Sequence, residues 1–323
     1  MKVSPRGSVL RRVTSPSAVT GLRRLTSATF ATVLLAGGAV ACGEGSESDS
    51  AQEGPAKATP RAAVAKAATN SEDITSLHYR ITGTVPQTGR LEAEASMSTE
   101  PPVMSMGMTT ADHGEDGRLE VRFVDEVMYA GGSAVDSTKL DGKSWFSARP
   151  AVWGRGAVDN NSYRVLPSQL EGSPVVQSRI LTASKDVRKV GTETVDGTRT
   201  MHYRGTVTRG GMSAARDAAA NKAARERQIE SLDQFIALRI DDTLTMDLWI
   251  DDAGRTRQFR MRGDTRATRG GTEGKPLEFT DGEPLDMTVT FLDVNQPVTV
   301  ETPPSEDTAD IAALADKAQS AGD

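Results

Sequence analysis

The feature that most constrains the fold of this chain is a long series of segments in which apolar and polar residues alternate. Period-two alternation is typical of strands with one buried and one solvated face, and the short connections between the segments favour antiparallel order. We therefore predict an α+β fold built on a single antiparallel sheet of about ten strands. The segments are residues 77–81, 91–97, 104–108, 119–123, 126–129, 144–146, 190–195, 198–203, 243–250, 256–262, 285–291 and 298–300.

Helical segments interrupt the series and could cover the apolar face of such a sheet. Residues 60–68 combine an early proline with an alanine-rich run, which predicts a helix. Residues 166–183 read as a helical or irregular connection, and residues 311–315 as a short helix. Residues 212–240 are rich in Ala, Arg, Glu and Gln, with an apolar stripe late in the segment, and predict one helix of about four to six turns. The segments 61–68 and 229–240 are the candidate covers.

The N-terminus has the organisation of an export signal. Basic residues and no acidic residue occur before position 42, and residues 28–41 form an apolar run too short to span a bilayer comfortably. Cys42, the only cysteine, follows this run directly. The segment resembles a bacterial lipoprotein signal, whose lipobox ends in a cysteine that becomes diacylated, although Ala39 stands where that motif usually has Leu. The resemblance implies a lipid anchor at Cys42.

An ordinary secretory signal is the alternative interpretation. Cleavage after Ala39-Val40-Ala41 would then leave Cys42 as a free thiol. One cysteine cannot form an internal disulfide, so an unpaired thiol in an exported protein needs a reason, and lipidation supplies it. We therefore favour the lipoprotein signal.

These signals divide the chain into four parts. Residues 1–41 are predicted to be a signal peptide, 42–59 a flexible tether, 60–305 one domain and 306–323 an acidic C-terminal tail. Without the signal, 32 basic residues stand against 44 acidic ones, a net charge near −12. Such a chain is unsuited to neutralising phosphates, so we expect no nucleic-acid partner and membrane attachment through the lipid of Cys42.

Residue types that carry catalysis or bind metals are present but do not form a motif. The three histidines are His78, His113 and His202, and we interpret His78 and His202 as solvated strand residues and His113 as part of a turn. The acidic pairs at 241–242 and 251–252 do not read as paired catalytic carboxylates, because neighbours on a strand point to opposite faces and the second pair occupies a turn. We therefore predict no enzyme activity, no metal and no cofactor.

The methionines point to an apolar ligand or to ordinary core packing. Met104, Met106 and Met108 alternate on one strand, and other methionines occupy strand positions along the chain. Methionine is flexible and polarisable, which suits a cavity for variable apolar ligands and equally suits an irregular core. Both interpretations stay open. The candidate cavity residues are Met97, Met104, Met106, Met108, Met201 and Met246.

Three stretches of the C-terminal half resemble one family of actinobacterial lipoproteins. Residues 190–207 form a hairpin around Asp196-Gly197, residues 246–255 contain a second hairpin turn, and residues 292–304 form a closing segment. Together with Cys42 they are similar to the LppX/LprA/LprF/LprG family. That resemblance implies a fold like the lipoprotein carrier LolA: a curved half-barrel sheet with helices on its concave face and an apolar cavity between them.

The function expected from this resemblance is non-enzymatic. A monomer would sit on the outer face of the cytoplasmic membrane, anchored by Cys42, and bind or carry a lipid or other amphiphile. The alternative is a cell-envelope sensing or interaction module that uses the same scaffold without lipid cargo. Ligand identity, transport direction and protein partners do not follow from the sequence.

Overall fold

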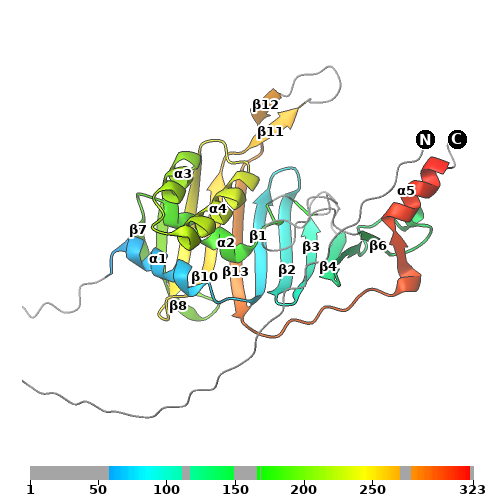
Figure 1. The fold of residues 1–323 in the computed structure, drawn as a ribbon, viewed down its shortest axis with the longest axis horizontal. Coiled ribbons are helices and arrows are strands. Elements are labelled where there is room, and N and C mark those ends of the chain that lie inside the picture. Colours follow the sequence, from blue (N-terminus) through cyan, green and yellow to red (C-terminus); the bar gives the residue numbers. More distant parts are fainter. Residues whose placement is uncertain (1–57, 111–116, 149–165, 168, 270–277, 321–323) are drawn as a thin grey trace, which may run out of the picture. The chain divides into compact units, whose positions relative to one another are not determined.

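Twelve strands form one large, curved and unclosed sheet in the computed structural model (Figure 1). The model describes residues 58–110, 117–148, 166–167, 169–269 and 278–320, all within the compact unit Pro55–Asp323. Neighbouring strands are antiparallel except for the parallel pair of β14 and β6. From edge to edge the order is β14 (Thr308–Asp310), β6 (Trp145–Ala148), β5 (Val127–Gly131), β4 (Arg118–Val124), β3 (Pro102–Thr110), β2 (Gly89–Thr99), β1 (Ser76–Val85), β13 (Leu285–Val294), β10 (Thr256–Gly263), β9 (Thr243–Asp251), β8 (Thr198–Thr208) and β7 (Arg188–Val195).

Helices lie on one side of this sheet, and a two-stranded ribbon projects from one end (Figure 1). The ribbon consists of β11 (Arg266–Arg269) and β12 (Glu278–Asp281). The α-helices are α1 (Pro60–Asn70), α2 (Pro174–Ser178), α3 (Arg209–Asp217), α4 (Lys222–Ala237) and α5 (Ile311–Ser320), and the 3₁₀ turns are η2 (Ser137–Leu140), η4 (Ile180–Ala183) and η5 (Ser305–Asp307). The predicted architecture, a curved antiparallel sheet with helices, is thus confirmed. In the described part of the chain, no helix is long and apolar enough to cross a bilayer.

Two predicted local structures are confirmed in detail. Residues 60–68 lie in α1, where Thr59 caps the helix by accepting a hydrogen bond from the Ala62 N–H at 3.2 Å. The Asp196-Gly197 turn joins β7 to β8, and both residues have positive φ angles of 43° and 74°. This is the backbone that a two-residue hairpin requires, and it explains the Asp-Gly pair.

The helix predicted over residues 212–240 is wrong as a single element, because the chain forms α3 and α4 instead. Asn221 separates them and caps α4, its side-chain oxygen accepting from the Ala224 N–H at 2.9 Å. Asparagine competes with helical backbone hydrogen bonding and favours a cap, so the second helix starts anew at this residue.

The strand predicted over residues 298–300 is also wrong, because these residues pair with no strand. The chain leaves the sheet at Asn295, whose φ of 56° turns the backbone after β13. The Asn295 side chain holds that turn by accepting from the Thr75 N–H and donating to the Asp73 carbonyl. Pro297 follows two residues later. It has no N–H to donate to a neighbouring strand, so it does not favour continued strand pairing.

The sheet extends beyond residue 305, where the sequence predicted an acidic tail with a short helix but no strand. Residues 308–310 form β14 beside β6, followed by α5, which contains the helix predicted at 311–315. Lys143 donates to the carbonyl of Thr308 at 3.1 Å, and the Ser144 N–H donates to the Asp307 carboxylate at 2.9 Å. These contacts hold the C-terminal segment against the sheet edge.

The two halves of the sheet meet at β13, which pairs with β1 on one side and β10 on the other. Gly83 of β1 faces this junction with a φ of 143°. A Cβ atom at Gly83 would lie 2.1 Å from the Asp286 carbonyl oxygen, closer than any real contact. Only glycine allows β1 and β13 to approach this closely.

We expect Gly83→Ala to destabilise the domain by at least about 3 kcal/mol, because it adds both backbone strain and a clash with Asp286. Gly191→Ala is the matched control, since a Cβ on Gly191 of β7 meets no atom within 4 Å. Urea unfolding of both variants measures the difference. Equal stability of the two variants would contradict the role assigned to Gly83.

Candidate functional site

Methionine and phenylalanine side chains form a row across four strands of the N-terminal half. Met97 of β2 lies opposite Met104 of β3, which lies opposite Phe123 of β4, and Phe123 in turn lies opposite Met128 of β5. All four side chains are buried. The alternation of strand residues places them on the same face of the sheet.

The two neighbouring methionines of β3 continue this surface. Met106 lies opposite Ala95, and Met108 opposite Ala93, and both methionines are at most 2% exposed. Small alanines beside flexible methionines make a surface whose shape the thioether chains can adjust. We call the set Met97, Met104, Met106, Met108, Phe123 and Met128 the methionine face.

Met246 belongs to a different part of the interior. It lies opposite Met261 of β10, which lies opposite Met287 of β13, and all three are fully buried. Gly205 of β8 also lies opposite Met246, and the Leu181 side chain of η4 reaches within 3.1 Å of where a Gly205 Cβ would be. The Met246 row is therefore covered by the chain itself and is ordinary core.

Met201 stands apart from both groups. It lies on β8 next to the sheet edge, where it is only partly buried, and its sulfur lies 4.0 Å from the Thr192 hydroxyl. Of the six methionines predicted to line a cavity, the structure therefore brings four together on β2 and β3. Met201 and Met246 lie elsewhere on the sheet.

Four of the five described α-helices cover one half of the sheet, while α5 packs against β6 and β14 at the far edge. Figure 1 shows α1, α2, α3 and α4 over the strands from β7 to β13, where their buried side chains join the core. These include Val64 of α1, Met212 of α3 and Phe235 of α4. Over β2, β3 and β4 the described residues place no helix (Figure 1). Among the described residues, helices therefore pack over the Met246 row but not over the methionine face.

Tyr79 lies between these two halves. It sits on β1 opposite Phe291 of β13 and Ala95 of β2, and is 2% exposed. Burial raises the pKa of its hydroxyl. Tyr79 therefore brings a neutral hydroxyl into a largely apolar interior, beside the methionine face.

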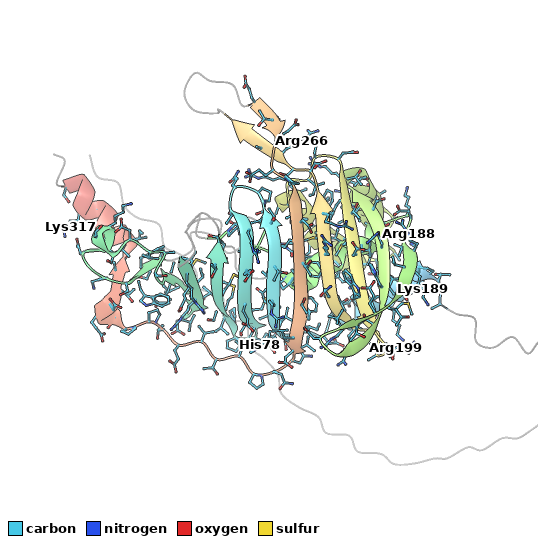
Figure 2. The ribbon with its side chains drawn as sticks, turned by 180° about the vertical axis from the view of Figure 1, so that it is seen from behind. His78, Arg188, Lys189, Arg199, Arg266 and Lys317 are labelled. Atoms are coloured by element: carbon cyan, nitrogen blue, oxygen red, sulfur yellow. The ribbon has the colours of Figure 1, made fainter. Side chains whose placement is uncertain are left out.

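The opposite face of the sheet carries a polar network that the sequence interpretation missed (Figure 2 shows this face). His202 is only 4% exposed, so its prediction as a solvated strand residue was wrong. Its Nδ1 lies 2.7 Å from Glu193 and its Nε2 lies 2.6 Å from Asp247. The ring stacks on Trp249 with centroids 4.3 Å apart, and the Trp249 indole donates to Glu193 at 2.8 Å.

Asp247 is the centre of this network and is 1% exposed. Besides His202, it accepts from Arg204 at 2.6 Å and from Arg262 at 2.7 Å. Burial alone would raise the pKa of Asp247, but the hydrogen bonds from Arg204, His202 and Arg262 outweigh it and lower the pKa below its ordinary value. The carboxylate is therefore ionised and fully partnered, which is what a structural role requires.

The other residues considered for chemistry also have structural explanations. Asp251 accepts from the Arg255 N–H at 2.9 Å and closes the turn between β9 and β10, and Asp241 pairs with Arg266. His78 is half-buried on β1. Among the described residues no group of three His, Cys, Asp or Glu could hold a metal ion. His113 and Cys42 lie outside the described residues.

Similarity to known proteins is remote. No protein-family model matches the chain. A Streptomyces griseus protein described as an uncharacterized 31.2 kDa protein of the rplA–rplJ intergenic region is 26% identical over 207 residues. The match covers 64% of this chain and 61% of that protein, so the chain spans less than two thirds of its relative's length.

Two lipoproteins of known structure have a related architecture. LprF from Mycobacterium bovis is 12% identical, with 76% of this chain and 97% of that chain covered and a TM-score of 0.45. LppX from Mycobacterium tuberculosis is 14% identical, with 75% and 98% covered and a TM-score of 0.42. In fold, the chain is similar to LprF and LppX. Both belong to the family that residues 190–207, 246–255 and 292–304 resemble.

We expect Asp247→Asn to destabilise the domain by about 3 kcal/mol at neutral pH, because it leaves Arg204, Arg262 and His202 without their buried anion. Since the folded-state pKa of Asp247 is lowered, its stabilising contribution is present above its ordinary pKa of 3.8 and is lost as the pH falls towards the folded value. The variant should lack this loss in thermal or urea unfolding at acidic pH.

Asp286→Asn provides the control for this prediction. Asp286 pairs with Arg260 on the same face of the sheet at 2.6 Å, but its side chain is 44% exposed. We expect a change of no more than about 1 kcal/mol for this variant. Similar losses for both substitutions would show that burial is not what makes Asp247 important.

Proposed function

We propose that this protein is a lipid-anchored, extracytoplasmic lipoprotein that binds a lipid or other amphiphile through the methionine face of its sheet. The observation that carries the proposal is the methionine face itself: a set of buried, mostly methionine side chains across β2 to β5, over which the described chain lays no helix. Its six side chains are at most 6% exposed, so an acyl chain would enter by parting the side chains packed there, which flexible methionines allow.

The composition of the face supports an acyl ligand over a rigid one. Unbranched methionine side chains adopt many rotamers and contact chains of different length or branching. Small alanine side chains lie opposite Met106 and Met108, so these methionines have room to change rotamer. Tyr79 supplies a polar contact at the border, where its hydroxyl can donate to an ester or carboxylate oxygen of the ligand.

The proposed location follows from Cys42 and the signal in front of it. A diacylated Cys42 would hold the mature chain at the outer surface of the cytoplasmic membrane, and residues 43–59 would allow the domain to reach the lipid surface. No enzyme activity is part of the proposal. The chemistry needed is removal of acyl chains from water, which an apolar surface provides without a catalytic group.

If the methionine face binds acyl chains, Met106→Phe should reduce the amphiphile that copurifies with the protein several-fold, because a rigid ring replaces an adaptable side chain. Met106→Leu conserves volume and should retain it. Native mass spectrometry of membrane-extracted protein measures the bound amphiphile, and circular dichroism confirms folding. Unchanged ligand content in Met106→Phe, or no ligand in the wild-type protein, would refute the proposed site.

Lipidation is tested separately through Cys42. We expect Cys42→Ser to move the protein from the membrane fraction to the soluble extracytoplasmic fraction or to leave the signal uncleaved. Intact-mass analysis of the wild-type chain should show a diacylglyceryl group on Cys42. An unmodified thiol on the wild-type protein would favour the ordinary secretory signal instead.

A further inference from the structure

A small pocket lies at the end of the sheet where the ribbon of β11 and β12 projects. Its volume is about 220 Å³. Five segments line it: the β1–β2 turn, the segment at Gln169, Arg239 just after the end of α4, and the two ends of the ribbon. Arg266, which Figure 2 labels at the base of the ribbon, lines it together with Arg239, Gln169, Asp281 and Glu283. The pocket is separate from the methionine face.

Gln169 is the feature that marks the pocket as a binding site. The residue is 3% exposed, and its side-chain oxygen is completely buried without a hydrogen-bond partner. Its backbone carbonyl is satisfied by Gln177 at 3.1 Å, so the unpartnered group is the side chain alone. Buried polar groups are nearly always paired, and an exception on a pocket wall points to a partner supplied from outside the chain.

The charges around the pocket are balanced but not mutually neutralised. Arg239 forms no ion pair with any described residue, whereas Arg266 pairs with Asp241. Glu283 accepts from the Gln87 N–H at 2.7 Å, and Asp281 lies at the end of β12. Two guanidinium groups suit an oxyanion such as phosphate. The two carboxylates repel a bare anion, so they favour a phosphate that also carries an ammonium or hydroxyl group.

The backbone around the pocket is held firmly. Arg239 follows α4 with a φ of 54°, a left-handed conformation that is costly for a residue other than glycine. The Arg239 carbonyl accepts from the Arg266 N–H at 2.8 Å, and the Thr265 hydroxyl donates to the Glu283 carbonyl at 2.6 Å. These bonds tie the end of α4 to the ribbon and fix the two arginines on one pocket.

Three core residues are close in sequence to residues that line the pocket. Val85, Leu238 and Leu285 lie within two residues of the lining positions and are at most 1% exposed. A molecule with a charged end and an apolar body could place its two parts on either side of the boundary between these lining and core residues. The pocket is too small for a whole lipid but large enough for a headgroup.

We propose that this pocket binds a phosphate group that carries a neighbouring ammonium or hydroxyl, as in a zwitterionic phospholipid headgroup or a free phosphate ester. Arg239 and Arg266 hold the phosphate, while Gln169 and Asp281 accept from the ammonium or hydroxyl. Binding of a phospholipid headgroup rests on the proposed function. Binding of a free phosphate ester is independent of it.

The test measures binding of four probes to the full-length protein in nonionic detergent by isothermal titration calorimetry. The probes are dihexanoyl-phosphatidylethanolamine, phosphoethanolamine, inorganic phosphate and decanol. Gln169→Leu removes the unpartnered carboxamide, and Arg239→Asn removes the cation with a residue that tolerates a left-handed backbone. Arg90→Gln removes a cation from β2, where the Arg90 side chain is 80% exposed and pairs with Glu92, and serves as the control.

We expect Gln169→Leu and Arg239→Asn each to weaken binding of the phosphatidylethanolamine about tenfold, while decanol binding and the Arg90→Gln variant stay unchanged. The melting temperature of Gln169→Leu should be equal to or above that of the wild type, because a buried unpartnered amide is removed. Phosphoethanolamine should bind more tightly than inorganic phosphate, since Asp281 and Glu283 repel a bare anion.

The probes separate failure of the pocket from failure of the proposed function. Wild-type affinity of both pocket variants for phosphatidylethanolamine would overturn the pocket, while decanol binding would still support an acyl site. No binding of decanol or phosphatidylethanolamine would overturn the proposed function. If phosphoethanolamine still binds and Arg239→Asn weakens that binding, the pocket is supported as a site for free phosphate esters. If phosphoethanolamine does not bind either, the pocket is overturned as well.

Discussion

The close contact of β13 with β1 is the constraint on which the rest of the structure depends. β13 comes from the C-terminal part of the chain and is the only described strand that pairs with both the N-terminal half, through β1, and the C-terminal half, through β10. Gly83 permits the approach. With this junction in place the inward residues of both halves form one core, and the methionine face and the helix-covered half become parts of the same interior.

The two faces of the sheet are stabilised by different interactions. The inner face depends on apolar burial by methionine, leucine and phenylalanine side chains, which conform to whatever they contact. On the outer face Asp247 binds three cationic or ring donors with fixed geometry, and Trp249 covers His202. Directional contacts outside and adaptable contacts inside are suited to a domain that keeps its backbone while its interior accepts ligands of variable shape.

Much of the fold could be predicted from the sequence because alternation and turn chemistry are local. The alternating segments and the Asp196-Gly197 turn predicted most of the strands in their correct order along the chain. Pro60 predicted the start of α1. What failed depends on contacts between distant residues. His202 reads as a solvated position until the register sets Trp249 and Asp247 beside it, and β14 has only three residues and no alternating pattern. The pocket around Gln169 unites five separate segments, so no single stretch of sequence could indicate it.

The pairing of β1 with β13 also determines when this chain can fold. The Thr75 N–H and the Asn295 side chain bond across 220 positions, and β14 follows later still. Contacts of such separation form slowly, and here they cannot form at all until nearly the whole chain is free. A chain emerging from a translocation channel would stay unfolded until its last strands have crossed. The order of the strands therefore delays completion of the sheet until almost the whole chain is available.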